Sequence, residues 1–200
     1  SATTTTTIAG ETINQETTTP TYTYNGTANN IDIVIGDGSY WRYVEVTLPV
    51  EKGINIIPTT DSNLFDLEEM TLLYDTSKNQ ASAKGEKEPA YREGHLDYMA
   101  NGDYAEYKVI NTKNTAYRIS FNTATPREGV TLTFTLYDEA GTQVVWSGTS
   151  QALEKNSNSS DWSTQSTGQI LTNYLQEGSY KLKITFNGSN TTANLYSVSF

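Results

Sequence analysis

Alternation of apolar and polar residues constrains this chain more than any other feature. A period of two recurs at residues 22–24, 31–35, 43–48, 132–137 and 180–186, which is typical of strands that bury one face. Gly, Asn, Asp or Pro residues bound these segments at the spacing of a β-sandwich, and convincing helical periodicity is absent. The sequence therefore predicts an all-β protein.

Length and charge limit the remaining possibilities. The chain has 200 residues, enough for one large β-sandwich or one and a half small ones. With 23 acidic and 13 basic residues its net charge is -10, which argues against a nucleic-acid partner because phosphate binding needs basic side chains. The sequence contains no run of roughly 18 apolar residues, so it predicts no membrane span. The N-terminus lacks the basic and apolar regions of a signal peptide, so we expect a piece of a longer chain.

Side chains suited to catalysis are scarce. The chain has no cysteine, and His95 is its only histidine, so a zinc site is implausible. A Ser-His-Asp triad would have to use His95, and no nucleophile-elbow motif accompanies it. A glycosidase needs two carboxylates about 5 to 10 Å apart, and nothing in the sequence pairs the many acidic residues.

Aromatic residues in polar loops indicate a binding surface instead. Tyr98 precedes an Asn-Gly turn, Trp162 lies in a loop rich in Ser and Asn, and Asn194 stands in the last predicted strand. An aromatic ring removes the apolar face of a sugar from water, while an amide both donates to and accepts from hydroxyl groups. This combination favours a neutral, polar polymer such as a polysaccharide.

From about residue 64 to its end, the chain resembles the family 6 carbohydrate-binding modules, with families 35 and 36 as relatives. Five motifs in the order of that family carry the resemblance. They are the acidic first strand at 65–72, the Gly-Asp-Tyr-Ala-Glu-Tyr strand at 102–109, Asp161-Trp162, the Leu-x-x-Gly turn at 175–178 and Asn194-Leu195.

The resemblance implies a jelly-roll β-sandwich that binds polysaccharide beside a glycosidase. In that family a Tyr and a Trp sandwich a sugar ring, and an Asn and a Glu hydrogen-bond its hydroxyls. By motif position these residues become Tyr98, Trp162, Asn194 and Glu86, with Glu88 as the alternative acid, because neither Glu is anchored by a motif.

A bound calcium ion is also common in the family. Asp66 and Glu68 supply the oxygen ligands that such a hard cation prefers, so we expect them to hold a structural calcium. Tyr196 stands where the family often has an Asp, which removes one ligand. The alternative is a solvated acidic edge that discourages strand pairing.

Two segments are expected in the chain. Residues 1–63 form an N-terminal β segment, possibly part of a preceding sandwich, and residues 64–200 form the carbohydrate-binding module. The surroundings of Trp41 echo those of Trp162, as an internal repeat or by convergence. Because residues 65–72 fit either segment, the boundary stays open.

Together these observations predict a non-catalytic module that binds xylan or β-glucan. We expect it to be covalently linked to a glycoside hydrolase, in a secreted or cell-surface protein of a bacterium, without nucleic-acid or membrane partners. One alternative is an adhesin or spacer sandwich without a sugar site, in which Tyr98 and Trp162 are buried or far apart. The other, a glycosidase domain, is less favoured.

Overall fold

The structure is a computed structural model that describes residues 7–8, 11–12, 33–34, 54–57 and 65–200. The chain divides into two compact units, Ser1–Pro49 and Val50–Phe200. In the first unit, strands β1 (Thr7–Ile8), β2 (Glu11–Thr12) and β3 (Ile33–Val34) form an antiparallel sheet of order β2-β1-β3. The predicted strands at 22–24 and 43–48, and Trp41, lie outside the described residues.

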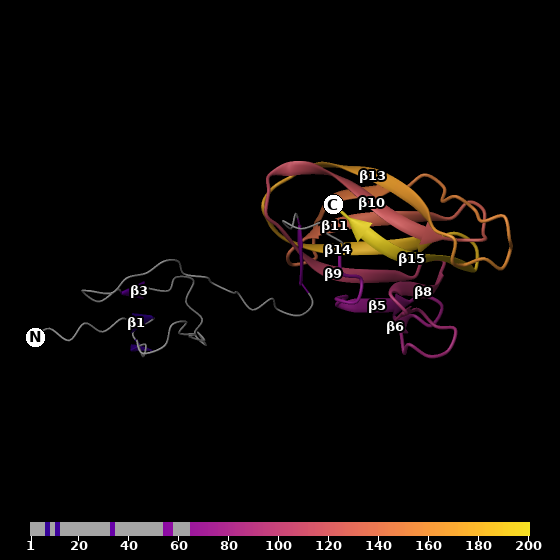
Figure 1. The fold of residues 1–200 in the computed structure, drawn as a ribbon, viewed down its shortest axis with the longest axis horizontal. Helices are drawn as coiled ribbons and strands as arrows, with labels where there is room; N and C mark the ends of the chain where they lie inside the picture. The colour runs from indigo at the N-terminus through magenta and orange to yellow at the C-terminus, as the bar shows by residue number, and fades with distance from the viewer. Residues whose placement is uncertain (1–6, 9–10, 13–32, 35–53, 58–64) are drawn as a thin grey trace, which may run out of the picture. The chain divides into compact units, whose positions relative to one another are not determined.

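Two sheets form the second unit (Figure 1). The five-stranded sheet, in spatial order, contains β13 (Ser166–Leu175), β10 (Thr115–Ala124), β15 (Thr191–Ser199), β8 (His95–Ala100) and β7 (Ala90–Arg92). The seven-stranded sheet contains β12 (Val144–Thr149), β11 (Thr131–Asp138), β14 (Gly178–Asn187), β9 (Tyr104–Asn111), β5 (Leu72–Asp75) and β6 (Gln80–Ala81), with β4 (Ile54–Ile57) also on β9. No helix occurs among the residues that the structure describes.

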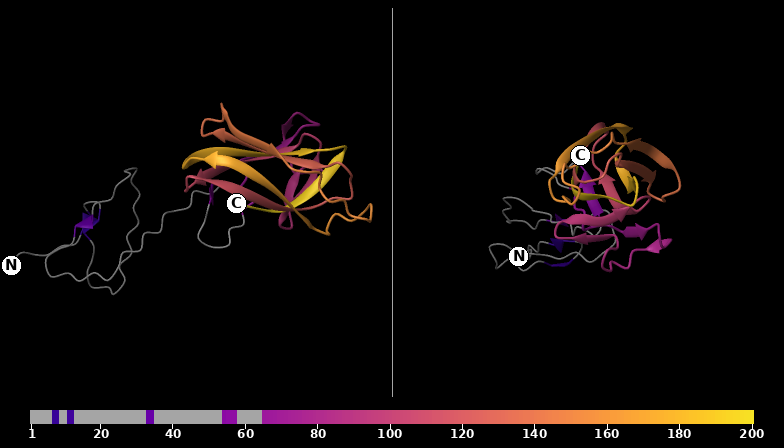
Figure 2. Two further views of the ribbon diagram at one scale, coloured as in Figure 1. Left: turned by 90° about the horizontal axis from the view of Figure 1, so that it is seen from above. Right: turned by 90° about the vertical axis from the view of Figure 1, so that its right-hand side faces the viewer.

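The core lies between the two sheets (Figure 2). Alternate residues of each strand point inward, as in β11, whose Leu132, Phe134 and Leu136 are buried. Phe121 of β10 meets Phe134 across the sheets, with ring centroids 5.3 Å apart. Consecutive strands β8 to β11 alternate between the sheets, which is the winding of a jelly roll. The predicted all-β sandwich is confirmed.

Strand β4, which precedes residue 64 in the sequence, belongs to the seven-stranded sheet. It pairs in parallel with the later part of β9, from Ile54 opposite Lys108 to Ile57 opposite Asn111. β5 pairs antiparallel with the earlier part of β9, so β4 and β5 share one edge of that strand. The compact unit thus takes in residues that precede the predicted start of the module.

The Asn101-Gly102 turn connects the two sheets. It joins the end of β8 in one sheet to β9 in the other, and Gly102 adopts a left-handed φ of 85° that favours glycine. The carbonyl of Gly102 accepts the Thr76 hydroxyl at 2.7 Å. The turn therefore fixes the chain just after Tyr98, the first of the predicted binding residues.

Candidate functional site

Tyr98 lies in a β-bulge of the five-stranded sheet. Leu96 of β8 pairs with Leu195 of β15, and Met99 pairs with Ala193, so Asp97 and Tyr98 together face the single residue Asn194. The φ of Tyr98 is 55°, a backbone conformation that costs energy for a bulky side chain. The bulge leaves Tyr98 36% exposed and directly across the strands from Asn194.

Asn194 connects β15 to the loop that carries Trp162. Its Nδ2 donates to the Trp162 carbonyl at 3.2 Å, and the Tyr196 hydroxyl donates to the same oxygen at 2.8 Å. Asn194 is only 5% exposed, yet its Oδ1 has no hydrogen-bond partner among the described residues. A buried amide with an unused acceptor is unusual, and here it lies between Tyr98 and Trp162.

Hydrogen bonds of Asp161 and Asn156 also order the Trp162 loop. The Asp161 carboxylate accepts hydrogen bonds from the backbone of Ser163 at 2.9 Å and of Thr164 at 3.0 Å. Hydrogen bonds from the side chain and backbone of Thr164, and then from Ser163, hold the pKa of Asp161 well below its ordinary value. Asn156 Nδ2 donates to the carbonyls of Asp161 and Thr164. Trp162 is half-buried on this loop.

A pocket of about 480 Å³ opens beside Tyr98. Its lining comprises Lys84, Glu86, Lys87, Arg92, Glu93, His95, Asp97 and Tyr98. The His95 ring stacks on Tyr196, with centroids 4.5 Å apart. Because Tyr196 also bonds the Trp162 carbonyl, this stack connects the pocket to the Trp162 loop.

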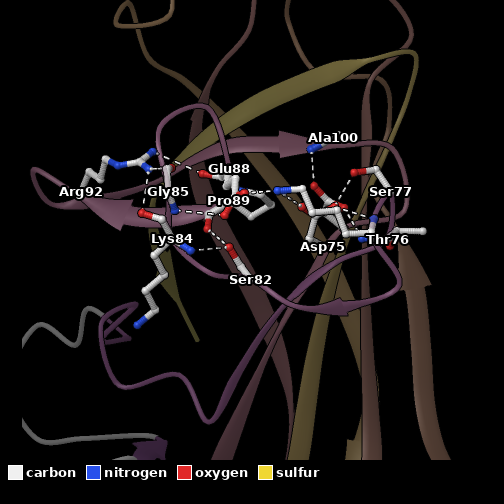
Figure 3. A network of polar contacts seen from close by, with 12 residues as sticks. Asp75, Thr76, Ser77, Ser82, Lys84, Gly85, Glu88, Pro89, Arg92 and Ala100 are labelled. Atoms are coloured by element: carbon white, nitrogen blue, oxygen red, sulfur yellow. Dashed lines mark hydrogen bonds and ion pairs between the residues drawn. The ribbon is translucent and has the colours of Figure 1, made fainter.

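The structure distinguishes between the two candidate acids. Glu88 is engaged: its carboxylate accepts from Lys78 Nζ and from the Gly85 backbone N–H, the latter at 3.0 Å (Figure 3). Glu86 is exposed, lines the pocket with Tyr98, and makes no hydrogen bond among the described residues. Of the two, Glu86 is the carboxylate available to a ligand.

Two buried carboxylates, those of Asp103 and Asp75, anchor the loop after β5; Asp75 and its neighbours Thr76 and Ser77 are labelled in Figure 3. Asp103, only 1% exposed, accepts the backbone N–H of Thr76 with Oδ1 and that of Ala100 with Oδ2, each at 2.8 Å. Burial raises the pKa of Asp103. Asp75 accepts the Ser77 hydroxyl at 2.6 Å. These bonds tie the loop after β5 to the end of β8.

Each of the two predicted stacking residues has an arginine over one ring face. The Arg92 guanidinium carbon lies 5.3 Å from the Tyr98 ring centroid, and that of Arg127 lies 5.6 Å from the Trp162 ring. Both distances are within cation–π range. Neither ring is buried, and no ring contact joins Tyr98 to Trp162 within the described part of the chain.

The predicted calcium ligands Asp66 and Glu68 lie in the segment between β4 and β5. Asp66 Oδ1 accepts the Glu68 backbone N–H at 2.9 Å, and the Asn55 side chain hydrogen-bonds both backbone polar groups of Asp66. In the described ranges no three His, Cys, Asp or Glu side chains come together, whereas calcium takes about six to eight oxygens. The side chains present do not by themselves fit the ion, and calcium stays a prediction.

Several residues of the site were not predicted from the sequence. Arg92 ends β7, Asp97 lies in the bulge of β8, and Arg127 lies in the bend after β10; no motif marks any of the three. His95 was considered only for catalysis, and Tyr196 only as a lost calcium ligand. A signal for Tyr196 does exist, since it follows Asn194 by two residues and so shares its face of the strand.

Comparison with protein-family models finds no match for this chain, and comparison with curated proteins finds none either. Several solved structures are similar to it. A family 6 carbohydrate-binding module from Clostridium stercorarium in complex with cellobiose has a TM-score of 0.48 at 13% identity, covering 69% of this chain and 92% of that one. A family 6 module from Clostridium cellulolyticum in complex with xylose has a TM-score of 0.45 at 15% identity, covering 69% and 95%. A β-1,3-glucan-binding module of that family from Bacillus halodurans has a TM-score of 0.40 at 18% identity, covering 56% and 81%. A likeness at these identities concerns the fold alone.

Within the described residues, no helix is long and apolar enough to cross a bilayer.

Proposed function

We propose that the Val50–Phe200 unit is a non-catalytic carbohydrate-binding module whose site contains Tyr98, Trp162, Asn194 and Glu86. One observation carries the proposal. The bulge at Tyr98 lies opposite Asn194, and the Asn194 amide binds the Trp162 loop with its nitrogen while its oxygen has no partner in the described part of the chain.

This arrangement suits a pyranose. The apolar face of the sugar stacks on an exposed aromatic ring, and the ring attracts its polarised C–H groups. The exposed, charged Glu86 accepts a strong hydrogen bond from one ligand hydroxyl, and Asn194 Oδ1, which is buried in the structure, accepts one from another hydroxyl once the ligand uncovers it. Loops that are already ordered lose little entropy on binding. We expect affinities between millimolar and micromolar, roughly -4 to -8 kcal/mol.

The ligand class follows from the same residues. The two aromatic rings favour a flat, β-linked chain such as xylan or β-glucan, and the net charge of -10 opposes polyanions. The sequence motifs support attachment to a glycoside hydrolase and a secreted or cell-surface location in a bacterium. A structural calcium at Asp66 and Glu68 stays a prediction from the acidic first-strand motif, and the proposal does not depend on it.

Affinity electrophoresis followed by isothermal titration calorimetry tests the proposal. Xylan, mixed-linkage β-glucan, mannan and cellulose serve as ligands for the wild type and for Trp162→Ala, Tyr98→Ala and Tyr174→Ala. Tyr174 is a matched control: it is 62% exposed on β13 and pairs with Ala116, at the opposite end of β10 from Ala124, which pairs with Asn194.

We expect one of the β-linked glycans to be retained, with at least tenfold weaker binding by the Trp162 and Tyr98 variants and unchanged binding by the Tyr174 variant. Retention of none of the four glycans, or equal effects of all three substitutions, would contradict the proposal. Release of reducing sugar by the purified chain would show a glycosidase instead.

A further inference from the structure

Arg92 contacts each side of the pocket beside Tyr98. Its Nη1 donates to the Glu88 carbonyl at 3.3 Å, and its Nη2 donates to the carbonyls of Gly85 and, at 3.4 Å, of Lys84 (Figure 3). On the other side, Nη1 forms an ion pair with Asp97 Oδ2 at 3.6 Å, and the guanidinium lies over the Tyr98 ring.

The loop bound by Arg92 has a backbone that needs such support. Lys84 and Lys87 both adopt left-handed φ angles, of 58° and 61°, which are unfavourable for residues other than glycine. Glu86 stands between them and enters the pocket lining. A planar guanidinium can bond several carbonyls at once, whereas the ammonium of a lysine is a single compact point of charge. The position therefore favours arginine over any other cation.

Asp97 extends the connection to the bulge. Its Oδ1 accepts the Tyr98 backbone N–H at 2.7 Å, while its Oδ2 faces Arg92. Through Asp97, Arg92 thus acts on the backbone of Tyr98, and through three carbonyls it acts on the loop of Glu86. No other side chain in the described part of the chain is bonded both to the loop of Glu86 and to the bulge of Tyr98.

We infer that Arg92 is a positioning residue of the site, which fixes the loop of Glu86 against the bulge of Tyr98. It acts through these two residues, since its donors are already directed at the protein. The consequence for glycan binding rests on the proposed function, whereas the consequence for the loop does not.

Loop order in the absence of any glycan is the first test. The full chain is compared as wild type, Arg92→Ala, Arg92→Lys and, as control, Arg118→Ala. Arg118 is an exposed residue of β10 whose side chain makes no hydrogen bond or ion pair among the described residues. Hydrogen exchange of residues 82–92 is measured relative to β14, and cleavage by a lysine-specific protease is followed after Lys84 and Lys87.

We expect at least tenfold faster exchange and cleavage of this loop in both Arg92 variants, with β14 unchanged, and wild-type behaviour of the Arg118 variant. Full protection in Arg92→Lys would show that charge alone suffices and would overturn the inference. Unchanged protection in Arg92→Ala would overturn it as well. If Arg92→Ala does not fold, the lysine variant decides.

Binding is the second test, with the four glycans named above. The Arg92 variants should bind the retained glycan at least tenfold more weakly, and this loss should vanish in a Glu86→Ala, Tyr98→Ala background because Arg92 acts through those residues. A loss of binding without loosening of the loop would mean that Arg92 contacts the ligand directly, against the inference. If the wild type retains no glycan, the proposed function fails while the loop test still decides on Arg92.

Discussion

Tyr98 and Trp162 present their rings by different means. Tyr98 belongs to a strand, and its exposure comes from a bulge with left-handed backbone that the neighbouring strand and Arg92 hold in place. Trp162 belongs to a loop, and its carbonyl is bound by side chains of β15. The first ring is placed by backbone strain within the sheet, the second by hydrogen bonds to the sheet. The Tyr98 ring is therefore held at a cost in backbone energy, whereas the Trp162 ring is held by additional hydrogen bonds.

The largest effect is expected on the Tyr98 side, from Asp103→Ala. The substitution leaves the backbone N–H groups of Thr76 and Ala100 without their acceptor at a buried position. Each such loss costs about 1 to 3 kcal/mol, so we expect unfolding free energy to fall by about 3 kcal/mol in urea denaturation. Asp103→Asn, which keeps one acceptor oxygen, should lose less. Equal stability of Asp103→Ala and wild type would show that the turn after Tyr98 does not depend on this carboxylate.

Strain at Tyr98 is tested by comparing Tyr98→Gly with Tyr98→Ala. Both remove the ring and should abolish its share of glycan binding, but only glycine adopts the left-handed φ without steric cost. The glycine variant should therefore be more stable than the alanine variant by about 1.5 kcal/mol, as measured by chemical denaturation. Equal stabilities would mean that the bulge is not strained, and the contrast with Trp162 would disappear.

Much of the difference in how Tyr98 and Trp162 are held could not be predicted from the sequence. Tyr98, Trp162 and Asn194 could be predicted as site residues because each stands at a fixed place in a local motif, and the alternating pattern predicted β11 and β14. The bulge depends on the register between β8 and β15, almost a hundred residues apart in sequence. Arg92 binds backbone carbonyls, and every loop has carbonyls, so no pattern of side chains indicates its role.

The effect on the Trp162 side should be smaller, as shown by Tyr196→Phe. This change removes one hydrogen bond to the Trp162 carbonyl but keeps a ring to stack on His95. A partly exposed hydrogen bond contributes about 1 kcal/mol, and Asn194 still holds the same carbonyl. Glycan affinity should fall only a few-fold in calorimetry. A loss as large as that of Trp162→Ala would show that Tyr196, and not Asn194, positions the loop.

Acid should weaken the Trp162 loop and leave the Tyr98 bulge in place. The pKa of Asp161 is lowered from 3.8 by hydrogen bonds to its charged form, so its contribution to stability is complete above the ordinary value and is lost as pH falls below it. The pKa of Asp103 shifts in the opposite direction, because burial raises it. Protonation of Asp103 in acid therefore favours the folded protein. The difference in unfolding free energy between wild type and Asp161→Asn isolates the first carboxylate, and it should shrink steadily between about pH 5 and pH 2. A difference that stays constant over this range would mean that the Asp161 charge does not order the loop, which would then be held by Asn156 and by the side chains of β15.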